Sequence, residues 1–500
     1  MSRRLRRAML MAGMGLLASG PAVVAPAGAD DLRSALVSAY QTNPTLQAAR
    51  ANQRANDENV PIQRAAGLPS ASLGATHTEI VDPGNAISAF TSPDRQFQGN
   101  LTLNVPIYSG GAVRNSVSAA KVRVEAGQAD LRGTESQVFS QAVAAYMDVI
   151  QNEAIVGLNR NNVEVLEVNL RATSDRFEIG DLTRTDVAQS RSRLELARGQ
   201  ARTAEANLVA ARERYIQVIG APPGTLAPPP PLPGLPASPD DATRIALENN
   251  PDLIAARERS KAAEYDIEVA GAGRLPKLEV FTGGTYTDYY GTAPFSQIPG
   301  LPATQSSRGA TAGVRASIPI FQGGRPAAQE RQAQARAGAT LEQEIEAERG
   351  VIAQVRSAYS SWRAANEIIA SSQSAVDAAS LSLEGVRAEN SVGNRTILDI
   401  LNAEQELLNA QVELVRARRN AYVAGFSLLA AMGRAEAQDL GLEGGPLYDP
   451  NTNYKRVRGK VFDWEFDPDP VARSTRTVTV PAQDASVAAQ PPVTTPPQPR

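Results

Sequence analysis

The fold of this chain is decided by the stretch Val105-Pro106-Ile107-Tyr108-Ser109-Gly110-Gly111, because the periodicity of the sequence changes across it. Before it, from Phe97 onward, apolar residues alternate with polar ones, which is typical of a strand of about ten residues. After it, apolar residues follow a helical spacing over a much longer segment. The stretch therefore predicts a direct passage from a strand into a long helix.

The same stretch occurs twice. Its copy is Ile318-Pro319-Ile320-Phe321-Gln322-Gly323-Gly324, at an offset of 213 residues, and this offset holds without a gap to Met432-Gly433. Further upstream, Asn43-Pro44-Thr45-Leu46 matches Asn250-Pro251-Asp252-Leu253 at an offset of 207 residues. An internal repeat of this length indicates two copies of one structural unit.

The repeat also sets the expected domain boundaries. We predict a first structural repeat over residues 30–220, with a helix over 31–66, two strands and a long helical hairpin, and a second repeat over 241–433. Residues 221–240 form a proline-rich linker, since its prolines cannot continue a helix. Residues 434–500 are expected to be a C-terminal region that ends in a disordered tail over 491–500.

Residues 1–29 have the composition of a secretory signal peptide. Four arginines precede an apolar run, and Ala27-Gly28-Ala29 supplies the small residues of a cleavage site. A retained anchor helix is the alternative, but Gly20, Pro21 and Pro26 interrupt a run that would need about 20 apolar residues. Removal of this segment changes the net charge from −3 to −7. No later run reaches about 18 uninterrupted apolar residues, so strands would make any membrane crossing.

Composition excludes several classes of function. The chain has no Cys and one His, which leaves no basis for a disulfide framework, a Cys/His zinc site or a cysteine nucleophile. Its 50 basic residues are outnumbered by 53 acidic ones, and no basic cluster with interleaved aromatics is present. We therefore expect no catalytic activity, no cofactor, no metal and no nucleic-acid partner.

After each Gly-Gly the sequence predicts an unusually long helix. A single helix over residues 112–178 would span roughly 100 Å at about 1.5 Å per residue. Apolar residues recur every seven positions in both predicted hairpins, which favours a left-handed seam with the returning helix. The turns fall at Gly180 and Gly393, where glycine ends one helix, and Thr183 and Thr396 are expected to cap the next.

Each repeat contributes two predicted strands, so one chain has four. Weaker alternation over residues 71–80 and 278–289 supplies the first strand of each pair, and the copy of the second runs from Ala310 to Ile320. Four strands cannot close a barrel in lipid, and closure needs other chains. Two chains give eight strands with a filled interior, whereas three give twelve and leave an opening. We expect a mainly α chain with a transmembrane β-barrel completed as a twelve-stranded homotrimer.

These motifs resemble those of the TolC family of outer-membrane export ducts, over about residues 31–440. The resemblance rests on both repeated motifs and on residues 391–403 at the second turn, SVGNRTILDILNA. It implies a homotrimer with its barrel in the outer membrane and a long α-helical barrel in the periplasm, where the C-terminal region also lies. It further implies docking to an inner-membrane transporter, ABC or proton-driven, and a periplasmic adaptor, for drug efflux or type I protein secretion.

The resemblance also assigns residues to a periplasmic gate at the hairpin turns. Arg395 would link to Thr185 and Asp186 of the other repeat, since a guanidinium can bind a hydroxyl and a carboxylate together. Asp399 would belong to an acidic ring in the narrowed lumen. Asn402 stands where the family archetype has a second Asp, so the ring is expected to be less acidic.

Two alternatives remain open at this point. Asp186 and Asp399 can be explained as acids favoured by the dipole at helix N-termini, although a dipole does not account for Arg395. A periplasmic coiled-coil adaptor without a membrane barrel would use the long helices, but it leaves the alternating strands unexplained. Detergent dependence separates an adaptor from a duct.

Overall fold

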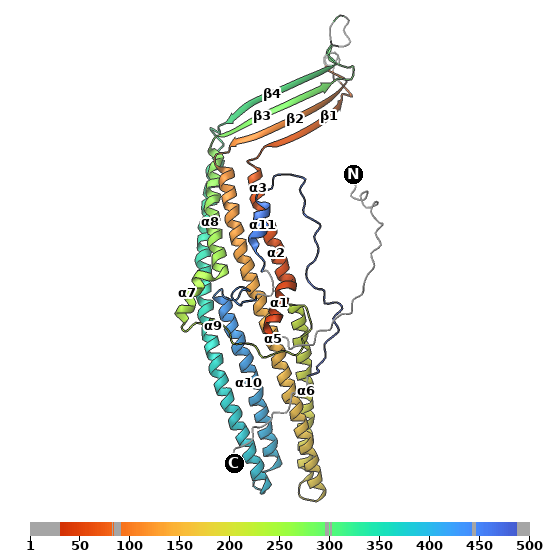
Figure 1. The fold of residues 1–500 in the computed structure, drawn as a ribbon, viewed down its shortest axis with the longest axis vertical. Helices are drawn as coiled ribbons and strands as arrows, with labels where there is room; N and C mark the ends of the chain where they lie inside the picture. Colours follow the sequence, from red (N-terminus) through yellow and green to blue (C-terminus); the bar gives the residue numbers. More distant parts are fainter. Residues whose placement is uncertain are drawn as a thin grey trace.

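The computed structural model describes residues 31–82, 84, 92–295, 300, 303–442 and 447–487. The predicted signal peptide and the predicted disordered tail over 491–500 lie outside these residues. The protomer is elongated, with a sheet at one end and long helices running away from it (Figure 1). Sheet and helices follow one another along the chain twice, in the order that the repeat predicts.

The first predicted helix, over residues 31–66, is wrong as a single element. It consists of α1 (Leu32–Thr42), α2 (Pro44–Asp57) and α3 (Asn59–Ala65). The break occurs because the Asn43 side chain accepts the first N–H groups of α2 and donates to the carbonyl of Val218 at 2.8 Å. Proline at the first position of α2 suits a helix start.

The second repeat uses the same device. Asn250 separates α7 (Pro239–Asn249) from α8 (Pro251–Gly271) and donates to the carbonyl of Ala431 at 2.9 Å. Asn250 and Asn43 are both buried against the last turn of their repeat's returning helix. The duplicated Asn-Pro motif therefore fixes the start of each repeat to its end.

Four antiparallel strands form one sheet in the order β1-β2-β3-β4. They are β1 (Ser70–Glu79), β2 (Arg95–Tyr108), β3 (Lys277–Asp288) and β4 (Ser306–Ser317). The prediction that the last strand reaches Ile320 is wrong, since β4 ends opposite Lys277, where β3 begins. Pro276 precedes Lys277 and has no N–H to offer a longer ladder.

The two long helical hairpins confirm the expected lengths and turns. They are α5 (Ala112–Glu178) with α6 (Arg184–Ile219), and α9 (Arg325–Ser391) with α10 (Ile397–Ala431). Each of the two longest helices has 67 residues, or roughly 100 Å at about 1.5 Å per residue. Gly180 and Gly393 both adopt a φ of 83°, which L side chains rarely adopt. The returning helix of each hairpin packs along its partner, as the seven-residue spacing predicts.

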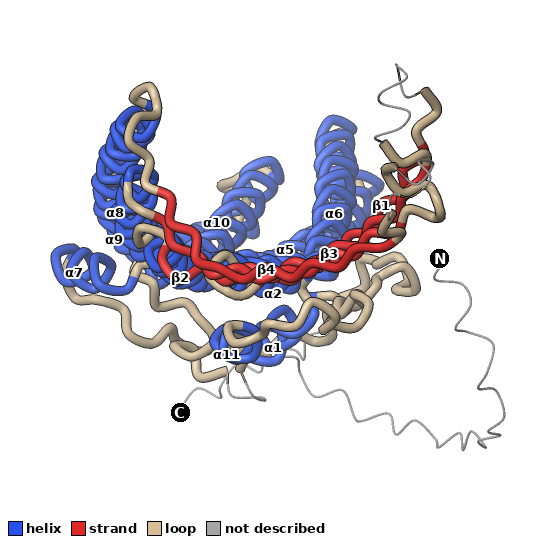
Figure 2. The backbone as a smooth tube through the Cα atoms, turned by 90° about the horizontal axis from the view of Figure 1, so that it is seen from above, coloured by secondary structure: helices blue, strands red, loops and turns tan. Residues whose placement is uncertain are grey.

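The helices and the sheet curve in the same sense. Viewed from above, they form an arc, with α1, α7 and α11 (Pro450–Val457) on its convex side (Figure 2). Helix α8 packs against both α5 and α9, and α10 packs against α5. The main core lies where these helices meet and contains Phe139, Tyr146 and Phe426. No helix in the described part of the chain is long and apolar enough to cross a bilayer.

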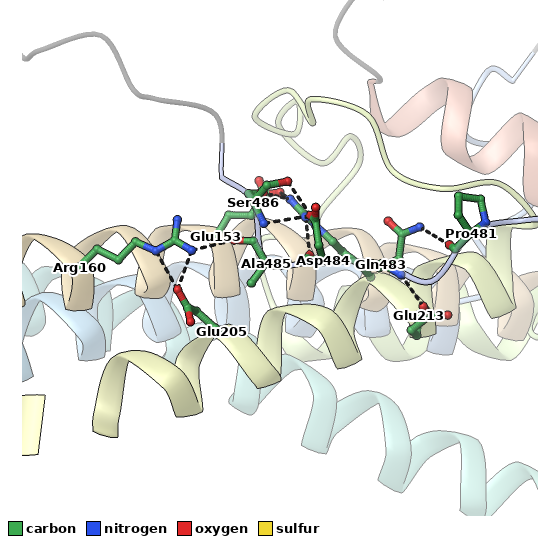
Figure 3. Close-up of polar contacts among 10 residues, drawn as sticks. Glu153, Arg160, Glu205, Glu213, Pro481, Gln483, Asp484, Ala485 and Ser486 are labelled. Atoms are coloured by element: carbon green, nitrogen blue, oxygen red, sulfur yellow. Dashed lines mark hydrogen bonds and ion pairs between the residues drawn. The ribbon is translucent and has the colours of Figure 1, made fainter. Parts of the chain in front are cut away.

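The chain after α11 runs back in extended form along the first hairpin, over α5 and α6 (Figure 3). Arg212 of α6 donates to the carbonyls of Asp484 and Ser486, at 2.7 Å each. Arg160 of α5 donates to the carbonyl of Ala485 at 3.0 Å. We call residues 483–487 the C-terminal strap, a feature that the sequence did not predict.

Candidate functional site

The candidate site lies at the free ends of the two hairpins, farthest from the sheet (Figure 1). At the first tip, Thr183 and Asp186 cap α6 reciprocally. The Asp186 N–H donates to Thr183 Oγ1, while Asp186 Oδ2 accepts from the Thr183 N–H at 2.9 Å and from its hydroxyl at 2.7 Å. This capping box forms because Thr and Asp stand three residues apart at the start of the helix.

The second tip repeats the geometry. Thr396 and Asp399 cap α10, with Asp399 Oδ2 accepting at 2.9 and 2.8 Å. Arg395 lies exposed at the turn, and its Nε donates to Glu389 Oε2 at 2.7 Å. Asn390 closes the same turn by donating to the carbonyl of Arg395 at 2.7 Å. Both tips are thus hydrogen-bonded turns that present charged groups.

Capping keeps the two aspartates ionised. The hydroxyl and then the backbone N–H of Thr183 lower the pKa of Asp186, and the N–H and then the hydroxyl of Thr396 lower that of Asp399. In each pair the capping bonds of the carboxylate use Oδ2. Within the described chain, Oδ1 of both aspartates remains open to a further cation or donor.

The structure does not bring all predicted gate residues together within one chain. Arg395 pairs with Glu389 of its own hairpin rather than with Asp186, and Thr185 is exposed on the first turn of α6. Asn402 instead joins the two hairpins, because its Oδ1 accepts from Arg193 of α6 at 2.7 Å. Beside it, Leu401 is buried against Leu166 and Leu194 of the first hairpin.

Sequence reasoning missed Glu404, which lies on α10 about one helical turn after Leu401. Its side chain is 5% exposed and accepts from Asn169 of α5 at 2.9 Å and from Arg387 of α9 at 3.0 Å. One carboxylate therefore holds three helices of both hairpins. The available signal was an acid at the centre of an apolar stripe between Leu401 and Leu408.

Among the described residues, the charged side chains of the two tips form no metal-binding cluster. Throughout the described ranges, no three His, Asp or Glu side chains gather in a way that could hold a metal ion. The charged groups at the tips serve as caps and as ion pairs between helices. Their arrangement can hold helices together and present charge.

Comparison with known proteins agrees with this geometry. The profile of the family described as outer membrane efflux protein matches residues 35–221 and 243–434. The outer membrane efflux protein BepC of Brucella suis biovar 1 (strain 1330) is 35% identical over 455 residues, covering 89% of this chain and 95% of that protein. The outer membrane protein TolC of Escherichia coli (strain K12) is 29% identical over 433 residues, covering 82% and 84%.

A solved structure shows the same fold. The Campylobacter jejuni CmeC outer membrane channel aligns with a TM-score of 0.71 at 18% identity, covering 86% of this chain and 89% of that chain. Both halves of the family profile fall on segments that contain a pair of strands and a long hairpin. The chain belongs to the outer membrane efflux protein family.

Proposed function

We propose that three copies of this chain assemble into a closed duct, with a twelve-stranded barrel in the outer membrane and a helical tube in the periplasm. The observation that carries the proposal is the sheet itself. In the described chain β1 and β4 each pair on one side only, so both edges present unpaired backbone groups. Lipid cannot satisfy these groups, and β4 of one copy can pair with β1 of the next.

Unequal burial of the two longest helices supports assembly. α5 and α9 have the same length, yet α5 buries 21 residues within the chain and α9 buries six. Large apolar side chains remain exposed on α9, among them Leu341, Ile368 and Leu381. Because α5 and α9 occupy equivalent places in the two repeats, they are expected to bury similar numbers of apolar side chains. We therefore expect a neighbouring copy to cover the exposed face of α9.

The two faces of the sheet suit lipid and water. Leu73 pairs with Leu101, and Val280 pairs with Val105 and Val314, which makes one face of the sheet largely apolar. The opposite face has Arg315 paired with Glu279 at 2.6 Å. An apolar outer face and a charged inner face are typical of membrane barrels.

The hairpin tips would form the periplasmic gate. We propose that Arg395 exchanges Glu389 for Asp186 and Thr185 of the first hairpin when the tips close. The free Oδ1 of Asp186 and its lowered pKa support this pairing, since they leave an ionised acceptor available. Asp399 would line the lumen, and Asn402 would hold α10 on α6 through Arg193.

Members of this family are transport channels of tripartite export systems. We infer that this chain acts without catalysis, as a conduit that opens when an inner-membrane transporter and a periplasmic adaptor dock at its tips. The cargo, a drug or a secreted protein, is set by the transporter, because a passive duct offers no substrate pocket of its own. The sheet and the family together disfavour an adaptor that lacks a barrel.

The mass of the purified complex tests the assembly. In detergent, native mass spectrometry should give three chains, and the same sample should conduct ions in a planar bilayer. Since the chain has no Cys, single cysteines placed on β4 and β1 should cross-link only between neighbouring copies. A monomer or dimer that inserts and conducts would overturn the twelve-strand assembly.

A further inference from the structure

The loop that follows α11 is held firmly at its base. Helix α11 is fixed to α2 because Asn453 donates to the fully buried Asp57 at 2.7 Å. Arg64, at the end of α3, donates to the carbonyl of Arg458 at 3.2 Å. The chain therefore leaves α11 at a defined place, beside the passage from α3 into β1.

The loop closes on itself between residues 456 and 467. Arg456 binds Asp467 through two contacts of 2.6 and 2.8 Å, and Lys460 binds Glu465 at 2.9 Å. Phe462 and Glu465 bracket a tight turn, with a backbone hydrogen bond of 3.3 Å. We call residues 460–467 the aromatic loop.

Three aromatic side chains of the aromatic loop face outward. Phe462, Trp464 and Phe466 are 77%, 86% and 77% exposed. The chain has only two tryptophans, and the other, Trp362, packs against the core. The loop is fixed and exposes three aromatic side chains within five residues. Such a patch indicates that another surface covers these side chains in the assembled protein.

The position of the aromatic loop indicates which surface this is. The trace that follows α11 rises to the height of α3, close beneath the sheet, in Figure 1. Arg64, which binds the base of the loop, precedes the first residue of β1 by six positions. At the same end of the strands, Tyr108 closes β2 with an exposed ring. Helix α11 lies on the convex side of the arc, outside the proposed duct (Figure 2).

The charges of the aromatic loop suit a zwitterionic surface. Glu465 and Asp467 are both paired within the loop, with Lys460 and Arg456. Asp463 is the one acid of residues 460–467 without such a pair in the structure. A loop with aromatic side chains and little net charge partitions into a headgroup region without needing anionic lipid.

We propose that the aromatic loop is a membrane anchor, which inserts Phe462, Trp464 and Phe466 among the headgroups of the periplasmic leaflet of the outer membrane. This inference rests on the proposed function, because that function places the sheet in this membrane. The loop fixes the height and rotation of the helical tube relative to the bilayer. It does so through a segment far from the strands in sequence.

Depth-dependent quenching tests the anchor in the full chain. We would reconstitute Trp362→Phe, in which Trp464 is the only tryptophan, into phosphatidylcholine nanodiscs with brominated acyl chains. Trp464 emission should be lost relative to unbrominated lipid, and iodide in solution should quench it weakly. The same signal is obtained without altering Trp362, as the difference between wild type and Trp464→Phe.

A second tryptophan position provides the matched control. Val478 is equally exposed but lies near Thr475, which lines a pocket together with Gly220 at the end of α6, away from the sheet. Trp362→Phe/Trp464→Phe/Val478→Trp should be quenched by iodide and unaffected by brominated lipid. If brominated lipid quenches it as strongly as Trp464, the aromatic loop is no nearer to the bilayer than the segment beside α6, which overturns the anchor.

The remaining outcomes each decide the proposal. Quenching of Trp464 by iodide alone would mean that the loop faces water, and protection from both quenchers would mean that a neighbouring copy covers it; either result overturns the anchor. A chain that conducts ions but shows no lipid quenching contradicts the anchor alone. A chain that never enters the nanodisc contradicts the proposed function as well.

Discussion

The carboxylate of Glu404 accepts a 2.9 Å hydrogen bond from the amide of Asn169, 235 residues earlier in the chain. The contact joins the returning helix of the second hairpin to the long helix of the first. Because the same carboxylate also binds Arg387, movement of either hairpin away from the other would leave a buried acid without its donors. Glu404 therefore couples the two hairpins near their tips.

Replacing Glu404 by Gln should loosen this coupling. The neutral amide cannot pair with Arg387 and accepts more weakly from Asn169, so we expect a loss of about 2 kcal/mol per chain, typical of hydrogen bonds to a charged group. Single-channel conductance in a planar bilayer should rise above that of the wild type.

The matched control is Glu406→Gln, at an exposed position on the same helix. It removes the same charge without touching α5 or α9 and should leave conductance unchanged. An equal rise in conductance in both variants would show that the loss of charge on α10, rather than the loss of the contact with Asn169, opens the channel.

Arg395→Ser should also raise conductance and antibiotic permeability, because it removes the proposed cation of the gate. An exposed ion pair contributes little on its own because solvent screens it, but threefold symmetry would repeat the loss. Trimer stability should not change. Planar-bilayer recordings and antibiotic susceptibility measure the effect.

Glu389→Gln separates the two possible partners of Arg395. It removes the carboxylate that binds Arg395 within its own hairpin but leaves Asp186 in place. If Arg395 closes the gate through Asp186, Glu389→Gln should keep conductance low. Should both variants open the channel equally, Arg395 would act only by holding its own turn.

The sequence predicts the hairpins well because their signals are local. The bounds of α5 and the turns at Gly180 and Gly393 depend on a glycine, a capping Thr and a seven-residue spacing within a few turns of helix. The break at Asn43 was equally local, since Asn-Pro is a start signal for a helix, and our continuous helix over 31–66 overlooked it.

Contacts between the hairpins could not be predicted in this way. Glu404 reaches Asn169, and Asn402 reaches Arg193, across more than 200 residues. A seven-residue spacing predicts that a helix packs against a partner helix. It does not predict which residues of a third helix contact that pair. The proposed partner of Arg395 in the other hairpin would depend in addition on how the copies assemble.

Asp399→Asn should weaken cation selectivity without opening the tips, since it removes a proposed lumen charge and keeps an acceptor for the cap. The cap lowers the pKa of Asp399 below its ordinary value of 3.8, so the wild-type carboxylate stays ionised as pH falls toward 5. We therefore expect wild-type selectivity to be equal at pH 7 and pH 5. Reversal potentials in a salt gradient measure it. Loss of selectivity between these pH values would assign it to another group.

Glu135→Gln should change the pH dependence of stability. Burial raises the pKa of Glu135 to about 6 from 4.5, although its carboxylate accepts the Ala437 N–H at 2.6 Å. The stabilisation from the neutral form is complete below pH 4.5 and is lost as pH rises through about 6. Above that pH the free energy of unfolding of the variant, relative to that of the wild type, should be about 2 kcal/mol more favourable to folding than it is at pH 4. Tm differences from pH 4 to 8 measure this, and a constant difference would contradict it.

Arg212→Ala should release the C-terminal strap from the first hairpin. The mostly buried guanidinium binds Glu153 of α5 and the carbonyls of Asp484 and Ser486, and alanine replaces none of these contacts. Trypsin can report the release, because Arg473 and Arg476 lie in the segment that leads to the strap. Loss of charge-assisted bonds of about 1.5 kcal/mol or more should speed cleavage there roughly tenfold. The matched control is Arg214→Ala, which removes an exposed arginine two residues further along α6. In the described chain its side chain donates to Gln217 of the same helix, so this variant should be cleaved at the wild-type rate. Equal cleavage of both variants would mean that Arg160 and Glu213 hold the strap without Arg212.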